Sequence, residues 1–151
     1  MKNVFSVDTV GALEGRINAL TPEKTALWGS MNAGQMLAHC NVSYDMAYEP
    51  EKFPRPNFML RLMLKAFVKK KVVSDEPFAK KSPTAPAFII KDKRDFELEK
   101  GKLIANIRKT QALGAQHFEG KESVSFGALT SNEWNTMFYK HLDHHLSQFG
   151  V

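Results

Sequence analysis

The 151-residue sequence predicts an all-α fold in a single domain that covers residues 1–151. The chain is 43% hydrophobic and 25% charged, which is the composition of one ordinary globular domain of this length. Apolar residues recur at spacings of three and four near both ends of the chain, as in helices that bury one face. No pair of segments shows the alternation of apolar and polar residues that predicts paired strands.

Two helices are predicted in the first third of the chain. A helix over residues 9–20 places four apolar side chains on one face, at Val10, Leu13, Ile17 and Leu20. Thr21 can cap a new short helix, with Pro22 at its first position. A longer helix begins after Asn32, which caps it, and runs to about residue 48.

The segment over residues 58–72 is predicted to form a helix that is apolar on most sides. Its charges at Arg61, Lys65 and Lys69 recur every four residues and form one narrow polar ridge. Core packing, a dimer contact, a lid over a pocket and binding at a membrane surface remain open as ways to cover the apolar sides. Because one neighbouring helix cannot cover so much apolar surface, we expect a homodimer. The proline-rich stretch over residues 74–86 is predicted to be a long loop.

Two further helices are predicted in the last third of the chain. Apolar residues return at helical spacing over residues 94–112, and a polar connection containing Gly114 follows. Thr130 and Glu133 have the spacing of a capping box, in which each side chain accepts a hydrogen bond from the backbone N–H of the other residue. The last helix is therefore predicted to begin there and to run to Phe149.

Composition excludes a disulfide-stabilised or membrane-spanning protein. The chain has one cysteine, Cys40, so no intrachain disulfide can form. The longest apolar stretch, residues 58–68, contains Arg61 and Lys65 and is shorter than the roughly 20 residues that cross a bilayer. Residues 1–8 contain no apolar run typical of a secretory signal. We therefore expect a cytoplasmic protein without a membrane span.

The net charge of +5 arises from one middle segment. Residues 61–110 contain 14 basic and 6 acidic side chains, whereas the remaining residues contain 7 and 10. Such a segment can attract nucleic acid, but it lacks the interleaved aromatic and glycine residues of a nucleic-acid-binding module. A nucleic-acid partner is therefore disfavoured, and the segment can instead steer an anionic small molecule.

Histidines in the two best-defined helices form a candidate metal site. His141 and His145 lie one helical turn apart, about 6 Å, on a face that also carries Trp134, Met137 and Phe138. Two imidazoles in apolar surroundings are costly unless their nitrogens have partners, and a shared cation would satisfy both. The adjacent side chain, His144, is rotated by about 100° around the helix.

A third imidazole is needed to hold a divalent ion firmly, and His39 provides a candidate. It lies in the middle of the helix over residues 32–48, among mainly apolar neighbours. Three neutral imidazoles favour zinc, nickel or iron and leave a coordination position for water or substrate. The alternative is that the histidines are hydrogen-bonded structural residues without a metal. Cys40 is predicted to be a small buried hydrophobe, His117 a surface residue and Asp143 an outward-facing carboxylate.

Three stretches of the sequence resemble a known family. The runs LWGSMNAGQMLAHC at 27–40, FGALTSNEW at 126–134 and YKHLDHHLSQFG at 139–150 resemble a domain-of-unknown-function branch of the DinB/YfiT-like metalloenzyme superfamily. The resemblance implies an antiparallel four-helix bundle, usually dimeric, with a long crossover connection and here an additional middle helix. It also implies a divalent metal held by one histidine of the second helix and an H-x-x-x-H pair of the last. In this chain these residues are His39, His141 and His145.

The resemblance further implies a metal-dependent enzyme that acts on a small molecule. Relatives are similar to transferases and isomerases that activate a low-molecular-weight thiol, and others are similar to hydrolases. The metal would activate a water or such a thiol for attack on a small electrophilic molecule, in a pocket lined by Met46, Trp134 and Phe138. Thiol transfer is slightly favoured over hydrolysis. The alternative is a non-catalytic small-molecule or stress-response binding protein of the same fold.

Overall fold

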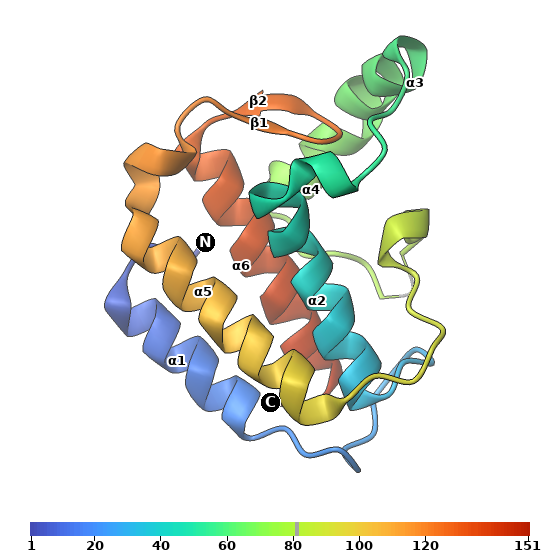
Figure 1. The fold of residues 1–151 in the computed structure, drawn as a ribbon, viewed down its shortest axis with the longest axis vertical. Helices are drawn as coiled ribbons and strands as arrows, with labels where there is room; N and C mark the ends of the chain where they lie inside the picture. Colours follow the sequence, from blue (N-terminus) through green and yellow to red (C-terminus); the bar gives the residue numbers. More distant parts are fainter. Residues whose placement is uncertain (81) are drawn as a thin grey trace.

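The computed structural model describes residues 1–80 and 82–151 and is mostly helical. Its long helices are α1 (Val7–Asn18), α2 (Ala33–Tyr48), α5 (Phe96–Phe118) and α6 (Ser131–Gln148). Helix α5 contacts the other three, and α2 also contacts α6 (Figure 1). Among the described residues, no helix combines the length and apolar composition that a bilayer crossing requires.

Side chains of the long helices form a single apolar core. The four apolar residues predicted on one face of the first helix are all buried, although α1 begins and ends two residues earlier than predicted. On α2 and α6, the rings of Tyr44 and Phe138 stack with centroids 4.7 Å apart. Trp134 and Phe118 contact the same Phe138 ring. This aromatic cluster fixes α2 and α6 side by side.

Two of the three predicted helix caps are present, at Asn32 and Thr130. The Asn32 side chain accepts a hydrogen bond from the backbone N–H of Gln35, and the Gln35 side chain accepts one in return. Thr130 and Glu133 do the same at the start of α6. These two reciprocal pairs satisfy backbone donors that would otherwise lack partners.

The prediction of a short helix after Thr21 is wrong. Residues 22–23 form a turn instead, which is closed by a hydrogen bond of 3.1 Å from Lys24 N to Thr21 O. The chain then follows α6 in an irregular conformation. Leu27 N donates to Gln148 O at 2.8 Å, which holds this segment against the end of α6. This tertiary contact replaces the local helix that the Thr-Pro pair favours.

The all-α prediction omitted a small antiparallel sheet. Strands β1 (Lys121–Ser123) and β2 (Gly127–Leu129) form a two-stranded hairpin in which Glu122 faces Ala128. Ser123 Oγ accepts a hydrogen bond from Phe126 N at 2.8 Å, and Gly127 has a φ of 78°, which favours glycine. Strands of three residues are too short to show an alternating pattern, so no sequence pattern predicts them.

The predicted helix over residues 58–72 is present, but it contains a π-helical stretch. Short helices η1 (Pro50–Lys52) and α3 (Phe58–Met63) lead into π-helical η2 (Leu64–Lys69) and α4 (Lys70–Val73). Figure 1 shows α3 protruding from the body of the molecule.

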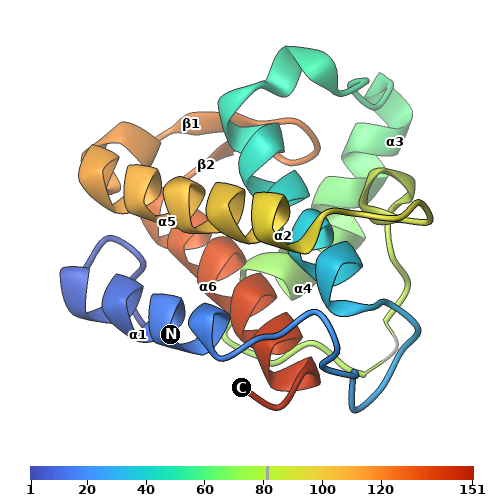
Figure 2. The same ribbon diagram turned by 60° about the horizontal axis from the view of Figure 1, so that its bottom comes forward.

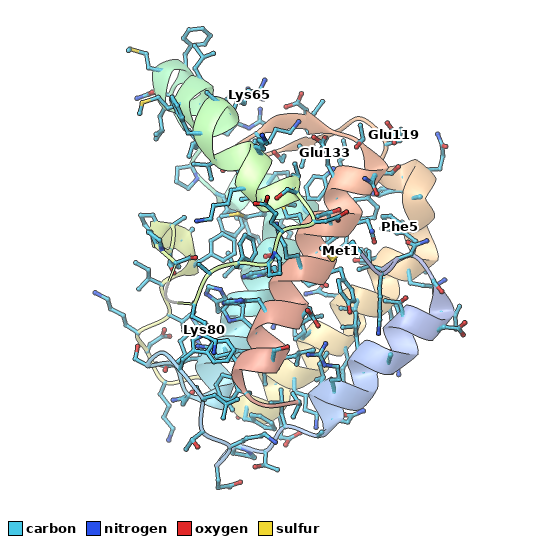
Figure 3. All side chains as sticks on the ribbon, turned by 180° about the vertical axis from the view of Figure 1, so that it is seen from behind. Met1, Phe5, Lys65, Lys80, Glu119 and Glu133 are labelled. Atoms are coloured by element: carbon cyan, nitrogen blue, oxygen red, sulfur yellow. The ribbon has the colours of Figure 1, made fainter. Side chains whose placement is uncertain are left out.

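The polar ridge of this segment faces the rest of the protein. Arg61 pairs with Glu122 and Lys69 pairs with Glu133, each at 2.7 Å. Lys65 lies between Arg61 and Lys69 in the sequence, and Figure 3 shows it beside the hairpin of β1 and β2. The large apolar side chains of α3 and η2 are therefore left exposed, at Phe58, Met59, Leu60, Leu62, Met63, Phe67 and Val68.

The connection from α4 to α5 passes outside α6 and α2 (Figure 2). It contains the predicted loop over residues 74–86, of which residue 81 lies outside the described part, and short helix η3 (Pro86–Phe88). Helix α5 loses helical geometry at Gly114, which has a φ of 71°, close to the end predicted near residue 112.

Candidate metal centre

The packing of α2 against α6 brings three imidazoles together. His39 lies in the middle of α2, and His141 and His145 lie one turn apart on the facing side of α6. Each ring offers one possible ligand nitrogen, and these three nitrogens all lie within 4.8 Å of one another. The Nε2 atoms of His39 and His141 are 2.9 Å apart. This three-histidine group can hold a divalent metal ion.

Two of the rings are oriented by oxygen atoms that can only accept a hydrogen bond. His39 Nδ1 lies 2.8 Å from the carbonyl oxygen of Phe88, and His145 Nδ1 lies 2.8 Å from Gln148 Oε1. The amide of Gln148 is itself fixed, because its Nε2 donates to Trp28 O at 2.6 Å. Each Nδ1 therefore carries the proton, and each Nε2 presents a lone pair.

The third ring has a partner that allows either tautomer. His141 Nδ1 lies 2.8 Å from Ser43 Oγ, and a hydroxyl can donate or accept. With no cation bound, Ser43 donates to Nδ1 and His141 Nε2–H donates to His39 Nε2. Moving the His141 proton to Nδ1, where Ser43 then accepts it, frees the third lone pair without changing the net charge. Such partners on the second ring nitrogen are typical of metal-ligating histidines.

The protein environment keeps the three rings neutral. His39 and His145 are buried, and His141 is partly exposed. Burial lowers the pKa of His39 and lowers that of His141 well below its usual value, with the neighbouring imidazoles adding to the effect at His141. Burial lowers the pKa of His145 to about 3. At neutral pH all three rings are thus in the form that binds a metal.

The donor set and its spacing fit a divalent transition metal. Two nitrogens bound to one zinc ion at about 2.1 Å each lie roughly 3.4 Å apart in tetrahedral geometry. The 2.9 Å between the Nε2 atoms of His39 and His141 is already close to that separation. The ligand atoms of all three rings lie within 4.8 Å of one another, so they must approach by about 1.4 Å or less to surround one ion.

A cavity of about 810 Å³ adjoins the three histidines. Of the residues predicted to line a pocket, Met46 and Trp134 do so. Phe138 does not, which corrects that prediction: it is buried in the core against Tyr44. It lies about 100° around α6 from Met137, which does line the cavity, so the two side chains face different sides of the helix.

The other residues considered from the sequence lie outside the three-histidine group. His144 lines the cavity, and its ring centroid is 5.0 Å from that of His145. Cys40 is buried, which raises the pKa of its thiol far above the usual value. His117 is exposed on α5. Asp143 pairs with Arg16 at 2.6 Å.

Sequence reasoning missed the residues that orient the rings. Gln148 lies three residues after His145, so helical spacing alone could have placed it beside the ring that it orients. Ser43 lies one turn after His39 but orients His141 of the facing helix, which spacing along one helix does not show. No sequence signal could have identified the carbonyl oxygen of Phe88, because its position depends on the path of the loop after α4.

Comparison with known proteins provides one match. No curated protein and no solved structure matches the chain. A family model described as a protein of unknown function, DUF1569, matches residues 5–150, which is almost the whole chain and includes all three histidines. The chain therefore belongs to the DUF1569 family.

Proposed function

We propose that the protein is a metal-dependent enzyme in which His39, His141 and His145 hold a divalent ion beside the cavity. The observation that carries the proposal is the orientation of the rings. Each Nδ1 contacts a protein oxygen, so that the Nε2 atoms are left for a shared ligand. Hydrogen-bonded structural histidines require neither this convergence nor an adjoining cavity.

A divalent ion in this position supplies a Lewis acid, which brings the pKa of a water or a low-molecular-weight thiol towards neutrality. Three protein ligands leave coordination positions for such a group and for substrate. The nitrogen-only donor set favours zinc, nickel or iron. Among the described residues no carboxylate lines the cavity, so none is placed to act there as a general base. We favour thiol transfer over hydrolysis, on the resemblance to thiol-dependent relatives.

We also propose that the chain is a DinB/YfiT-like protein. In this interpretation α1, α2, α5 and α6 are its antiparallel four-helix bundle, and the segment between α2 and α5 is the long crossover. The positions of the histidines on the second and last of these helices support the assignment. The single core shared by these helices supports one domain over residues 1–151.

A homodimer is the proposed assembly. The exposed apolar side chains between Phe58 and Phe67 lie close together and cover more than half of the circumference of this helical segment, so they form one continuous apolar surface. A monomer rarely exposes a continuous apolar surface of this kind. Because α3 protrudes from the body (Figure 1), the same face of a second copy can pack against it without obstruction.

Elemental analysis tests the metal site directly. We expect one equivalent of zinc, nickel or iron per chain in the purified protein, and loss of at least most of it in His39→Ala and in His141→Ala. His117→Ala is the matched control, since this histidine is exposed and distant in sequence from the group. Retention of metal by both site variants, or its absence from the wild type, would contradict the proposal and favour a non-catalytic binding protein.

A screen of thiol cofactors and water with small electrophiles tests the reaction. Turnover by the metal-loaded wild type is expected to fall at least about a hundredfold in His141→Ala, because Lewis-acid activation is lost. Turnover that is unchanged in this variant would remove the three-histidine group from the mechanism.

A further inference from the structure

We propose that the cavity beside the three histidines binds an apolar small molecule that carries an anionic group, and that it discriminates against cations. This inference rests on the proposed function and deepens it by naming the class of substrate. It follows from two properties of the cavity, the composition of its walls and the sign of the charges at its edge.

The walls of the cavity are mainly apolar and come from separate parts of the chain. The segment over residues 64–72 contributes Leu64, Val68 and Val72, which recur every four residues and thus share one face of the helix. Phe88 and Ile90 contribute a second wall from the connection to α5. The helix that exposes apolar side chains to solvent therefore also directs an apolar row into the cavity.

The volume of the cavity suits a small organic molecule. Ligand sites that enclose drug-sized molecules typically measure about 300–1,000 Å³ and have mostly apolar walls with a few polar groups. The cavity of about 810 Å³ lies within this range. Burying apolar ligand surface contributes roughly 25 cal/mol per Å², so these walls favour an aromatic or aliphatic body over a highly polar one.

The charged residues that line the cavity are all basic. Lys71 and Lys91 line it, and among the described residues no aspartate or glutamate does. A cationic ligand would therefore lose its hydration without gaining an anionic partner.

The two lysines are available to a ligand. Other basic residues of the segment 61–110 pair with carboxylates elsewhere in the chain, in Arg61–Glu122, Lys69–Glu133, Lys102–Asp45 and Arg108–Glu14. Within the described part of the chain, neither Lys71 nor Lys91 makes such a pair. Both are exposed while lining the cavity, so their charge lies at its solvent side. The anionic group of the ligand thus lies at the edge, and the apolar body extends towards the histidines.

Two probes with the same ten-carbon chain and opposite charge test the inference. Binding of decanoate and of decylammonium to the full chain is measured by calorimetry after chelator treatment, which prevents the carboxylate from binding a metal. Decanoate is expected to bind at least about tenfold more tightly, a difference of roughly 1.4 kcal/mol. Equal or tighter binding of decylammonium, or no binding of decanoate, would overturn the inference.

Tryptophan emission locates the bound probe. The chain has two tryptophans, Trp28 and Trp134, and both line the cavity. Decanoate is expected to change their emission, and a titration followed by emission should give the same dissociation constant as calorimetry. Binding without any change in emission would place the probe elsewhere, for example on the exposed face of α3, and would contradict the proposed site.

A pair of double variants separates local charge from net charge. Lys71→Glu combined with Lys91→Glu is expected to weaken decanoate binding about tenfold or more. The matched control is Lys70→Glu combined with Lys93→Glu, which changes the net charge equally at exposed lysines that do not line the cavity. We expect the control to weaken binding less than about threefold, because exposed charges farther away are screened by salt. If the two double variants weaken decanoate binding equally, Lys71 and Lys91 do not bind the anionic group at the edge of the cavity.

The inference and the proposed function can fail independently. Metal content is measured by elemental analysis of the untreated protein, whereas decanoate binding is measured on the chelator-treated protein, so neither readout depends on the other. Selective decanoate binding by a protein that never contains stoichiometric metal would support the ligand class and reject the metal enzyme. A protein that holds metal and shows no preference for decanoate would reject the ligand class alone.

Discussion

Gln148 links the metal centre to the segment before α2. Its Oε1 accepts the proton of His145 Nδ1, and its Nε2 donates to the carbonyl oxygen of Trp28. The next residue, Gly29, has a φ of 86°, and a Cβ there would lie 2.6 Å from Gln148 Nε2. Only glycine therefore allows the chain to approach closely enough to hold this amide in position.

Replacing Gln148 by leucine should weaken metal binding about ten- to a hundredfold, because His145 loses the acceptor that fixes its tautomer and orientation. Affinity is measured by competition with a chromophoric zinc chelator. Ser147→Ala, at the neighbouring exposed position of α6, is the control and should change affinity less than about twofold. Unchanged affinity in Gln148→Leu would show that the amide does not position the ring.

The lowered pKa values of the histidines predict how stability depends on pH. In the metal-free protein the folded-state pKa of each ring lies below its usual value. Below about pH 6.5 the unfolded chain then binds more protons than the folded one, so the free energy of unfolding falls as pH decreases. Each histidine contributes a slope of up to about 1.4 kcal/mol per pH unit. For His145 this slope continues towards its folded-state pKa of about 3.

Urea unfolding of chelator-treated protein between pH 7 and 5 measures this slope. His145→Gln should reduce it by up to about 1.4 kcal/mol per pH unit, since one titrating ring is removed. The ring NMR signals of His145 in the wild type give an independent reading and should remain those of neutral imidazole at pH 5. Stability that does not change over this range would contradict the prediction.

Among the elements, α4 is held in place by a single buried cation. Lys140 on α6 is buried, and its Nζ donates to the carbonyl oxygens of Lys71, Ser74 and Glu76 at 2.7, 2.5 and 3.1 Å. The ammonium also lies 4.5 Å from the centre of the Phe78 ring. One side chain thus fixes the end of α4 and the first part of the loop that encloses the cavity.

Lys140→Met should destabilise the protein by about 2 kcal/mol, because hydrogen bonds to a charged donor are lost and the methionine still fills the space. Backbone amides of residues 70–78 should exchange hydrogen faster than in the wild type, whereas those of α5 should change less. Lys70→Met is the matched control on exposed α4. If the backbone amides of residues 70–78 exchange hydrogen at the same rate in both variants, Lys140 does not hold this segment.

The elements differ in how well their sequences predict them. Asn32 and Thr130 begin helices through local capping contacts, which depend only on nearby residues, and both were predicted correctly. The hairpin depends on a turn closed by Ser123 and Gly127, and its strands are too short to show a period. The conformation around Thr21 depends on contacts with α6, which no local pattern contains.

At the scale of the whole molecule, the exposed apolar face predicts assembly. The double variant Phe58→Ser with Phe67→Ser should convert a dimer into a monomer, because both rings are more than three-quarters exposed in the single chain, at 77% each. Light scattering at micromolar concentration measures the mass. Leu98→Ser with Leu113→Ser removes exposed apolar side chains from α5 and should leave the dimer intact. A monomeric wild type would contradict the assembly.

The site could be predicted from the sequence only in part, for a reason of geometry. Helical spacing places His141 and His145 on one face, and the apolar neighbours of His39 indicate that it points inward. The cavity could not be inferred, because residues from several distant segments enclose it. Its basic edge likewise depends on which lysines are left without carboxylate partners, and that is a property of the folded chain.

The π-helical stretch η2 gives the protruding segment an unusual tolerance to changes in length. A π-helical turn accommodates one more residue than an α-helical turn, and such stretches commonly interrupt α-helices at functional sites. Deleting one residue within Leu64–Lys69 would restore ordinary helical winding, and because the extra residue lies in the wider turn, α3 and α4 would keep nearly the same orientation relative to one another. Such a deletion would change the cavity wall that Leu64 and Val68 form, while the direction of α3 and the positions of the histidines stay the same.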